Sequence, residues 1–559
     1  MRTIWTCWFQ GREAAPPLVQ RCLRSWEHNN PGWKLRCLDA ALIEQYVDFN
    51  RYIDLHRQSI TAASLSDILR IFLLREFGGV WVDATLYCNR PLDVWLPEVM
   101  QERFFAFAAP GPDRPLSSWF LSAQPDHGLI TKWHRRTIDY WSNRTGSDDY
   151  FWFHHLFRDM CESDSSAAEL WRRVPKVSAD GPHALQFGDL LYRPWREVIE
   201  SVDWTTPVFK LTYRLPEAGS KPESLLEHLL ERKADEHKLA ARPVTLPSAG
   251  AAPKIFASLK VSTENLGDHI QIIAGLRLQS RLGIEPIRYI DRDDEIRSAQ
   301  CLRDVAGPIG ILLNGWFKTN RAEWPPHPKL TPIIFGFHIR PFQCPELLSD
   351  ASIEFFRQHE PIGCRDSYTE ALLKSKGVKA FTSNCLSLTL SRRVDDPAKQ
   401  IEVFVVSRDE RLKEYLPPSI GDFTFVNHYS TCSDFAANMR RAEDLLETYR
   451  SRAKLIITTL LHCALPAIAM GIPVIVFYPI NGETAHKSDC ERFSSLEGLV
   501  TVYRIEEIEC VDWHPKLIDV SEIKLEILDR FHEMAAARWQ IEPRSPIGPI
   551  APSSLLPPP

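Results

Sequence analysis

The chain has 559 residues, which at about 150 residues per domain indicates roughly three or four lobes instead of a single domain. Its composition, with 44% hydrophobic and 25% charged residues, is typical of a folded soluble protein, and the net charge of −6 gives no reason to expect nucleic acid as a partner. The thirteen cysteines are scattered without a C-x-x-C pair, which argues against a zinc motif or a disulfide framework and favours reduced thiols in a cytoplasm.

The N-terminal segment alternates predicted strands and helices. Residues 1–11 lack the long apolar run of a signal peptide, so none is expected. We expect a strand at Thr3–Phe9, a helix at Val19–His28 and a second strand at Trp33–Leu38. Trp8 lies near the end of the first strand, where it is either a core residue or an aromatic face for a ligand.

Residues 61–77 predict a buried helix that carries two charges. Apolar residues cover this segment almost all round, which is typical of a helix inside a large domain. Asp67 and Arg70 lie within it, three residues apart. Because buried charges are costly unless they are paired or bound to something polar, the two residues form either an internal salt bridge or part of a polar site.

A short strand and a carboxylate follow this helix. Gly78–Gly79 is expected to end the helix, since glycine tolerates the left-handed conformation of helix caps. Val80–Val82 then predicts a strand, and Asp83 comes at its end. Ligands of α/β folds bind at the carboxyl ends of strands, so Asp83 is expected to face a ligand, with an ordinary loop aspartate as the alternative.

The order of these residues carries a family resemblance. The pattern S-D-x-x-R, helix, G-G, three hydrophobic residues and D-x-D appears as Ser66–Asp67, Arg70, Gly78–Gly79 and Asp83. It resembles the sugar-transferring family with a DxD motif, which includes capsular polysaccharide synthesis proteins and, more distantly, large clostridial glucosylating toxins. The resemblance implies that Asp67 and Arg70 hold the sugar of a nucleotide-sugar donor and that Trp8 stacks on its base.

The resemblance also implies a divalent cation, Mn²⁺ or Mg²⁺, held on the nucleotide diphosphate by the strand-end carboxylates. Here the third position of the DxD motif is Thr85, so Asp83 is the only motif carboxylate. Thr85 could supply a neutral oxygen, but hard cations prefer several anionic ones, and metal affinity is expected to fall. The predicted metal ligands are therefore Asp83 and Thr85.

Further along, βα alternation continues. A strand is expected at residues 117–123 and a helix at 128–141, which indicates a mostly parallel, GT-A-like sheet domain. The aromatic run Asp149–His155 ends in two histidines; it is either core or a sugar-binding face with a His as base or metal ligand. Pro207–Thr212 resembles the closing segment of the capsular branch, in which Lys210 would face the diphosphate unless it is simply solvated.

A change of composition separates two halves. Residues 231–253 are rich in charge, Ala, Pro and Ser without periodicity, which predicts a linker after a first domain at 1–230. Residues 254–540 predict a second series of strands and helices, which we interpret as a GT-B-like pair of Rossmann-type lobes split near 392–399. The Pro-rich tail 541–559 is expected to be disordered.

One uncharged stretch could be mistaken for a membrane span. Leu455–Tyr478 contains no Asp, Glu, Lys or Arg and is long enough to cross a bilayer. Thr458, His462, Pro466 and Pro473 interrupt it, which favours a buried strand, helix and strand instead.

The second half also carries motifs. They are N-x-G-D at Asn265–Asp268, C-R-D-S-x-x-x-x-L at Cys364–Leu372 and I-T-T-x-L-H-C-A at Ile457–Ala464. Residues 254–500 thereby resemble the polysaccharide pyruvyltransferase family, whose members move an enolpyruvyl group from phosphoenolpyruvate onto a pair of sugar hydroxyls. This implies that His462 performs acid–base catalysis, although a buried structural histidine is the alternative. Asp268 would bind the acceptor and act in catalysis, unless it only caps the helix after it.

A helix that begins just past a parallel strand attracts phosphate and carboxylate, and phosphoenolpyruvate carries both. The family usually has Arg two positions before the histidine, where this chain has Leu460, and leucine cannot grip an oxyanion. Arg365, Lys487 or Arg492 could supply the cation, with Asn265 also near the phosphoenolpyruvate. Otherwise the donor differs or this half has lost catalysis.

Together these patterns predict a two-module transferase of cell-surface polysaccharide synthesis. Its partners would be a nucleotide sugar, phosphoenolpyruvate and a glycan or lipid-linked glycan acceptor, with no cofactor in the second half. We expect a cytoplasmic enzyme without a transmembrane segment, able to work at the inner face of the plasma membrane. Two alternatives stay open: the second half is another glycosyltransferase, or one half is a non-catalytic scaffold in an assembly complex.

Overall fold

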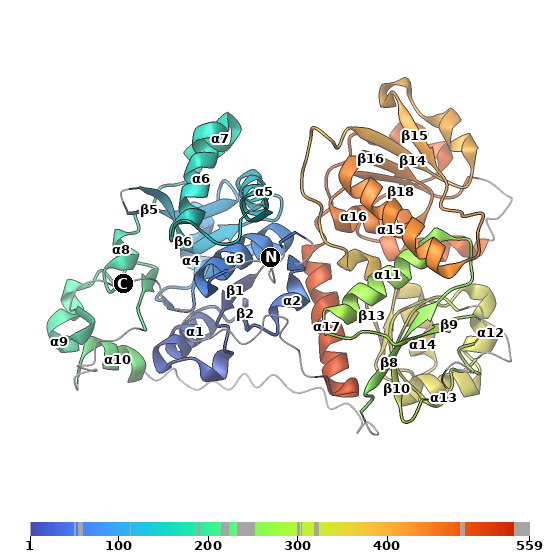
Figure 1. Cartoon of the computed structure of the whole chain (residues 1–559), viewed down its shortest axis with the longest axis horizontal. Coiled ribbons are helices and arrows are strands. Elements are labelled where there is room, and N and C mark those ends of the chain that lie inside the picture. Colours follow the sequence, from blue (N-terminus) through green and yellow to red (C-terminus); the bar gives the residue numbers. More distant parts are fainter. Residues whose placement is uncertain are drawn as a thin grey trace. The chain divides into compact units, whose positions relative to one another are not determined.

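Strands and helices alternate along the chain and build separate sheets in two compact units (Figure 1). The computed structural model divides the chain into a first unit, Met1–Pro243, and a second, Val244–Pro543. The structure describes residues 2–49, 52–53, 60–111, 113–142, 144–186, 190–213, 223–231, 252–293, 295–298, 302, 305–317, 324–480 and 487–541. Most of the predicted linker 231–253 and the tail from residue 542 lie outside the described residues, so the predicted domain bounds stay predictions.

The first unit is built on a sheet with strand order β2-β1-β3-β6-β5. β1 pairs in parallel with β2 and β3, whereas β6 is antiparallel to β3 and β5. A small antiparallel sheet joins β4 to β7. The strands are β1 (Thr3–Cys7), β2 (Lys34–Leu38), β3 (Gly79–Val82), β4 (Leu86–Cys88), β5 (Phe104–Gly111), β6 (Arg114–Ala123) and β7 (Val208–Lys210).

Helices surround this sheet. The predicted helices at 19–28, 61–77 and 128–141 are present as α1, α3 and α5, and the aromatic run at 149–155 leads into α6. The helices are α1 (Pro17–Asn29), α2 (Ile43–Tyr46), α3 (Ala62–Phe77), α4 (Leu92–Val99), α5 (Gly128–Ser142), α6 (Trp152–Ser163), α7 (Ser165–Arg173), α8 (Asp180–His183), α9 (Trp195–Val198) and α10 (Leu225–Glu231).

Helix α3 is the buried helix that the sequence predicts. The Thr61 side chain caps its first turn by accepting a hydrogen bond from the Ser64 N–H, and Gly78 ends it with a positive φ of 65°. Gly79 follows with φ +97°, and a Cβ there would lie only 2.6 Å from the Thr3 carbonyl oxygen. Glycine is thus needed for β3 to begin so close to β1. This pairing fixes where β3 ends, and Asp83 with it.

The second unit contains two parallel sheets in sequence. The first has strand order β13-β12-β11-β10-β8-β9, and the second β15-β14-β16-β17-β18. All the pairings in both are parallel. The first set of strands is β8 (Ile255–Lys260), β9 (Arg288–Asp291), β10 (Ile309–Gly315), β11 (Leu330–Phe337), β12 (Ile362–Cys364) and β13 (Ala380–Thr382); the second is β14 (Glu402–Val406), β15 (Phe423–Val426), β16 (Ala453–Thr458), β17 (Val474–Phe477) and β18 (Val502–Tyr503).

The helices of this unit link its two sheets. Helices α11 and α15 pack against each other (Figure 1), and α17 returns from the second sheet to contact β11 of the first. The helices are α11 (Leu266–Ser280), α12 (Cys344–Leu347), α13 (Asp350–Gln358), α14 (Ser367–Ser375), α15 (Phe435–Arg452), α16 (Leu461–Met470) and α17 (Ser521–Trp539). Both units are α/β, as predicted. The sheet of the first unit is mixed instead of mostly parallel, because β6 runs antiparallel to both β3 and β5.

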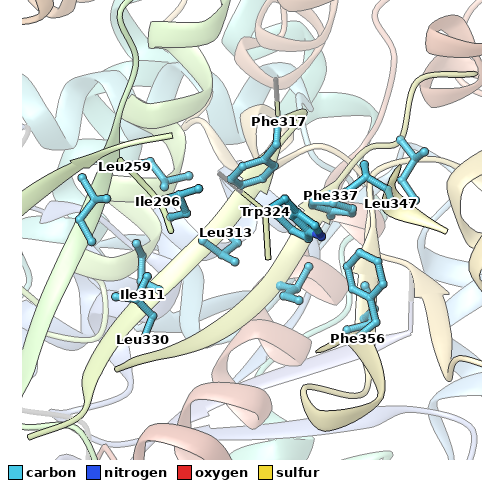
Figure 2. Close-up of a cluster of buried hydrophobic side chains, with 14 of the residues drawn as sticks. Leu259, Ile296, Ile311, Leu313, Phe317, Trp324, Leu330, Phe337, Leu347 and Phe356 are labelled. Atoms are coloured by element: carbon cyan, nitrogen blue, oxygen red, sulfur yellow. The ribbon is translucent and has the colours of Figure 1, made fainter. Parts of the chain in front are cut away.

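In the second unit, the core around the first parallel sheet contains aromatic and branched side chains (Figure 2). The Trp324 ring packs against Phe317, Phe337 and Phe356, with ring centroids 5.5, 6.0 and 5.9 Å away. Its indole Nε1 donates a hydrogen bond to Ser352 Oγ at 3.1 Å, so burial leaves no orphaned donor there. Burying each such side chain fully contributes about 1.5–3 kcal/mol.

The uncharged stretch at 455–478 forms the end of β16, helix α16 and strand β17, as the interrupting polar residues and prolines predict. Gly471 closes α16 in the left-handed conformation, with φ 70°. In the described part of the chain, no helix combines the length and the apolar character needed for a membrane crossing.

Candidate active sites

A pocket of about 370 Å³ in the first unit gathers the residues that the sequence assigns to the sugar donor. They come from the end of β1, from α3, from the turn after β3 and from β7. All six of them line this pocket: Trp8, Asp67, Arg70, Asp83, Thr85 and Lys210. Residues more than a hundred positions apart in the sequence thus meet where β1 and β3 end.

Arg70 connects the two aspartates. Its Nη2 lies 3.1 Å from Asp67 Oδ1 and 3.4 Å from Asp83 Oδ1, and its guanidinium lies 5.1 Å from the centre of the Trp81 ring. Its other terminal nitrogen donates to the Ser118 carbonyl. The internal Asp67–Arg70 salt bridge is therefore present, and it borders the pocket.

The Asp67 carboxyl titrates far above its ordinary range. Burial raises its pKa, the Arg70 guanidinium lowers it, and the nearby Asp83 carboxylate raises it again, to about 7. Near neutral pH this carboxyl is therefore about half protonated. In its protonated form it can donate a hydrogen bond as well as accept one.

Asp83 is held from both sides. Its Oδ2 accepts from the Lys210 ammonium at 2.7 Å, and its Oδ1 accepts from Trp81 Nε1 at 3.1 Å. Burial by itself would raise the pKa of Asp83, but Lys210 and Arg70 outweigh it and lower the pKa below the ordinary value. A turn then brings Thr85 back, closed by the Leu86 N–H donating to the Asp83 carbonyl at 2.8 Å.

The predicted metal ligands have a different partner in the structure. Lys210 Nζ donates to Thr85 Oγ1 at 3.0 Å as well as to Asp83, so its ammonium group bridges the two oxygens expected to bind Mn²⁺ or Mg²⁺. No cluster of three or more His, Cys, Asp or Glu suited to a metal occurs among the residues that the structure describes. As arranged, one engaged carboxylate and one hydroxyl do not fit a divalent cation.

Aromatic residues form another side of the pocket. Trp8 packs edge-on against Tyr213, with ring centroids 5.3 Å apart, and its buried indole Nε1 has no hydrogen-bond partner among the described residues. Of the two predicted histidines, only His154 lines the pocket. Burial, with Arg70 and Arg114 nearby, lowers its pKa to about 3, so it is neutral. His155 instead hydrogen-bonds Asp149 at 2.5 Å and Asp113 at 3.0 Å.

The second unit has its own cavity, of about 590 Å³. The first turns of α11 and α16 border it, together with the loop after β14. Of the residues predicted to act here, Asn265, Leu460, His462 and Arg492 line it. Two helix N-termini therefore face one cavity, and the partial positive charge of each favours an anion.

Gly267 allows these two helices to approach closely. Asn265 caps α11 by accepting a hydrogen bond from the Gly267 N–H at 3.2 Å. A Cβ on Gly267 would lie 3.0 Å from the Cβ of His462, at the start of α16. The glycine of the N-x-G-D motif thus has a packing reason to be there.

His462 is buried, and neither ring nitrogen has a hydrogen-bond partner among the described residues. Burial, followed by the charges of Arg365 and Arg492, lowers its pKa well below the ordinary value, so the imidazole is neutral in the free protein. An anion bound among these cations would offset their charge and raise the pKa.

Arg365 is the nearby cation that the sequence singles out. Its side chain is 1% exposed, and its Nε lies 3.4 Å from Asp366 Oδ2. Its two terminal nitrogens are buried with no hydrogen-bond partner among the described residues. Unpaired buried donors of this kind are costly unless a ligand satisfies them.

Asp268 lies outside this cavity. Asp268 is buried in the first turn of α11, where it accepts from Gln271 Nε2 at 3.3 Å and lies 3.8 Å from Arg292 Nη1. It does not line the cavity, and the helix cap is Asn265 instead, so the capping alternative for Asp268 is wrong. The side chain of Lys487 lies outside the described residues.

Several lining residues were not predicted. In the first pocket they include Ser118, Gln186 and Tyr213; in the second, Ser407, Arg408, Arg411 and His428. The loop at 407–411 could have been found, because it follows a predicted parallel strand, where ligands bind. His428 carried no such signal. It lies after an edge strand and hydrogen-bonds Tyr449 at 2.9 Å.

Comparisons with known proteins match the two halves of the chain to different families. Residues 1–229 match the family described as capsular polysaccharide synthesis protein, and residues 265–481 match the family described as polysaccharide pyruvyl transferase. The glycosyltransferase afumC of Aspergillus fumigatus is 27% identical over 162 residues, 26% of this chain and 41% of that protein. The O-glycosyltransferase braB of Annulohypoxylon truncatum is 25% identical over 178 residues, 28% of this chain and 42% of that protein.

Solved structures give distant matches. A functionally uncharacterized protein of Klebsiella pneumoniae is 14% identical with a TM-score of 0.27, covering 44% of this chain and 89% of that one. The glycosyltransferase GlyE of Streptococcus pneumoniae is 12% identical with a TM-score of 0.26, covering 56% and 91%.

The chain spans about two fifths of the length of the curated relatives it matches. Both resemblances carried by the motifs are confirmed, each over its own half. The names of the second family and of both relatives agree on one enzyme class. The first half of the chain is therefore similar to the capsular polysaccharide synthesis proteins, and the second half is similar to the polysaccharide pyruvyl transferases.

Proposed function

We propose that the chain is a two-module enzyme of cell-surface polysaccharide synthesis. The first unit transfers a sugar from a nucleotide sugar to a glycan or lipid-linked glycan. The second transfers a pyruvyl group from phosphoenolpyruvate to sugar hydroxyls. The enzyme works in the cytoplasm, where both small donors are made, at the inner face of the membrane when the acceptor is lipid-linked.

One observation carries the first activity: a single pocket brings together Trp8, Asp67, Arg70, Asp83 and Lys210 from four separate elements. The arrangement suits a nucleotide sugar. An indole with an unpartnered N–H offers a face for a base, the Asp67–Arg70 pair offers hydrogen-bonding groups for sugar hydroxyls, and two cations suit a diphosphate.

The test is transfer from a panel of nucleotide sugars to glycan acceptors, measured by release of the nucleoside phosphate. Asp83→Asn should abolish transfer, because it removes the carboxylate that holds Arg70 and Lys210 in place. Asp126→Asn is the matched control. Asp126 pairs with Arg75 at 2.6 Å away from the pocket, and its positive φ suits Asn. Full activity of the Asp83 variant would refute the assignment.

The second activity is supported by the cavity at the N-termini of α11 and α16, with Arg492 in its lining and Arg365 nearby, whose two terminal nitrogens have no hydrogen-bond partner among the described residues. Phosphoenolpyruvate carries a phosphate and a carboxylate, which match such a site. Ketal formation removes the protons of two sugar hydroxyls and delivers one of them to the enolpyruvyl methylene; the phosphate leaves with its bonding electron pair and takes up the other. The neutral His462 imidazole suits the first task, and the proton it gains suits the second.

The test is phosphate release from phosphoenolpyruvate in the presence of acceptor glycans. His462→Ala should lower it by about 10²–10⁴ and leave sugar transfer by the first unit intact. His359→Ala, which removes a histidine bonded to the Phe355 carbonyl outside the cavity, is the control.

One observation favours a second candidate for this half. Leu460 caps α16 and lines the cavity where the family has Arg, so the grip on an oxyanion is weakened. If phosphoenolpyruvate neither binds nor releases phosphate, and a nucleotide sugar still raises the melting temperature of the Asp83→Asn variant, whose first pocket is disrupted, the second half is another glycosyltransferase. If no donor binds, it is a scaffold.

A further inference from the structure

The Lys210 side chain is fixed in place, not solvated. β7 pairs with β4 so that Lys210 lies opposite Leu86, and the Leu211 N–H donates to the Thr85 carbonyl at 3.0 Å. The side chain is 13% exposed. Its Nζ reaches Asp83 Oδ2 at 2.7 Å and Thr85 Oγ1 at 3.0 Å, so backbone pairing and two hydrogen bonds both set its position.

This ammonium group excludes a metal ion from the same place. A divalent cation between Asp83 and Thr85 would lie beside a second positive charge and would find a single carboxylate. The other oxygen of that carboxylate already accepts from Trp81 and lies 3.4 Å from Arg70. Mg²⁺ and Mn²⁺ favour several oxygen ligands with little competing charge.

We propose that Lys210 takes the place of the divalent cation: it binds the diphosphate of the nucleotide sugar, and sugar transfer in the first unit requires no Mn²⁺ or Mg²⁺. This inference rests on the proposed function of that unit. It also explains the threonine in the third motif position. Thr85 Oγ1 accepts a hydrogen bond from the ammonium, whereas an aspartate there would add a second negative charge beside Asp83.

The chemistry of transfer shows what Lys210 would contribute. The bond between the anomeric carbon and the diphosphate oxygen breaks, and its electron pair stays on the diphosphate. The acceptor oxygen forms the new bond to the anomeric carbon, and its proton passes to solvent. Negative charge therefore grows on the diphosphate, and a fixed cation beside it stabilises the transition state.

Lys210 has the means to do so. An ammonium group has three N–H donors, and Asp83 and Thr85 accept from two of them. The third remains for a diphosphate oxygen. Arg70 supplies a further positive charge in the same pocket, within 3.4 Å of Asp83.

The first experiment uses the full chain and the nucleotide sugar found active in the panel. Excess EDTA should leave the rate of transfer unchanged, and Lys210→Met should lower it by about 10²–10³ without rescue by Mn²⁺. Lys210→Arg keeps the positive charge beside Asp83 and should retain part of the rate. It serves as a second variant in case Lys210→Met does not fold. Lys132→Met, which breaks the 2.6 Å ion pair with Asp164 outside this pocket, is the matched control. Loss of transfer in EDTA with recovery in Mn²⁺ would overturn the proposal.

The second experiment measures metal binding without any activity. Electron paramagnetic resonance of Mn²⁺ should detect no binding at this site in the wild-type chain. It should detect binding in the double variant Thr85→Asp, Lys210→Met, which adds the second motif carboxylate beside Asp83 and removes the ammonium group. Binding by the wild-type chain that disappears in Asp83→Asn would refute the proposal. If no nucleotide sugar is active, the proposed function fails, while the Mn²⁺ titration still decides whether Lys210 holds the metal position.

Discussion

Gly79→Ala tests how the first pocket is positioned. Gly79 has φ +97°, and an added Cβ would lie 2.6 Å from the Thr3 carbonyl oxygen, a distance that real Cβ contacts essentially never show. Both atoms belong to backbones held in register, since Ile4 pairs with Val80 and Trp5 with Trp81. Neither strand can move without disturbing the pairing. The clash must then be relieved by displacing β3, which leads directly to Asp83.

The magnitude follows from two separate effects. A non-glycine residue in this conformation costs about 1–3 kcal/mol, and overpacking against a fixed backbone costs about 1–3 kcal/mol more. Gly11→Ala separates them. Gly11 has φ +85°, but its added Cβ would meet only Asp39 Oδ2, at 3.8 Å, so this variant should show the conformational cost alone.

Calorimetric unfolding of the full chain and sugar transfer together form the assay. The unfolding transition of the first unit should be about 2–12 °C lower in Gly79→Ala than in Gly11→Ala, at about 2–4 °C per kcal/mol. Sugar transfer should fall in the Gly79 variant and persist in the Gly11 variant. Equal stability of the two variants would show that β3 can shift away from β1 and that the close approach does not fix the pocket.

Three further outcomes follow from buried and cavity groups. Burial lowers the pKa values of His134, His338 and His428 to about 3, 4 and 3, so these histidines take up protons at a higher pH in the unfolded chain than in the folded one. The free energy of unfolding should therefore fall as the pH drops from 6.5 towards 4, by up to about 1.4 kcal/mol per pH unit for each histidine. A melting temperature that stays constant over this pH range would contradict this. Burial raises the pKa of Asp67 to about 7, so the wild type should lose stability as the pH rises from about 4 to 7, whereas Asp67→Asn lacks this titrating group. The stability of the variant relative to the wild type should therefore increase over that range, which melting curves of both proteins at pH 5 and pH 8 would show. Leu460→Arg should tighten phosphoenolpyruvate binding about tenfold, measured by calorimetric titration, because a charged hydrogen bond contributes about 1.5–3 kcal/mol.

The first pocket could be predicted largely from the sequence because its residues follow from local rules. Asp67 and Arg70 stand on one buried helix, and Asp83 follows the strand after it. Once the strand order is assumed, this spacing along the chain predicts that Asp67, Arg70 and Asp83 lie close together. The role of Lys210 beside Asp83 could not be foreseen. It depends on β7 pairing with β4 across 125 residues between Lys210 and Thr85, and neither short strand has a periodic pattern of its own.

The second cavity was predicted less completely, for a different reason. Asn265 and His462 mark two helix starts, and helix starts after parallel strands are visible in a sequence. The loop at 407–411 lines the same cavity although it lies more than 130 positions after Asn265, so its place depends on the tertiary fold. Asp268 shows the converse: this motif residue in the first turn of α11 lies 3.8 Å from Arg292 Nη1 and does not line the cavity.

The charges of the two candidate sites are arranged differently. In the first, the Lys210 ammonium group is held against the Asp83 carboxylate, so much of its positive charge is balanced before a ligand binds. In the second, two helix N-termini and Arg492 border the cavity, and the two terminal nitrogens of the nearby Arg365 have no hydrogen-bond partner among the described residues. Part of the cost of burying these nitrogens is recovered when an anion satisfies them, so an anion should gain more from its contacts in the second site. At equal free ligand concentration, this tighter binding should stabilise the second unit more than the first.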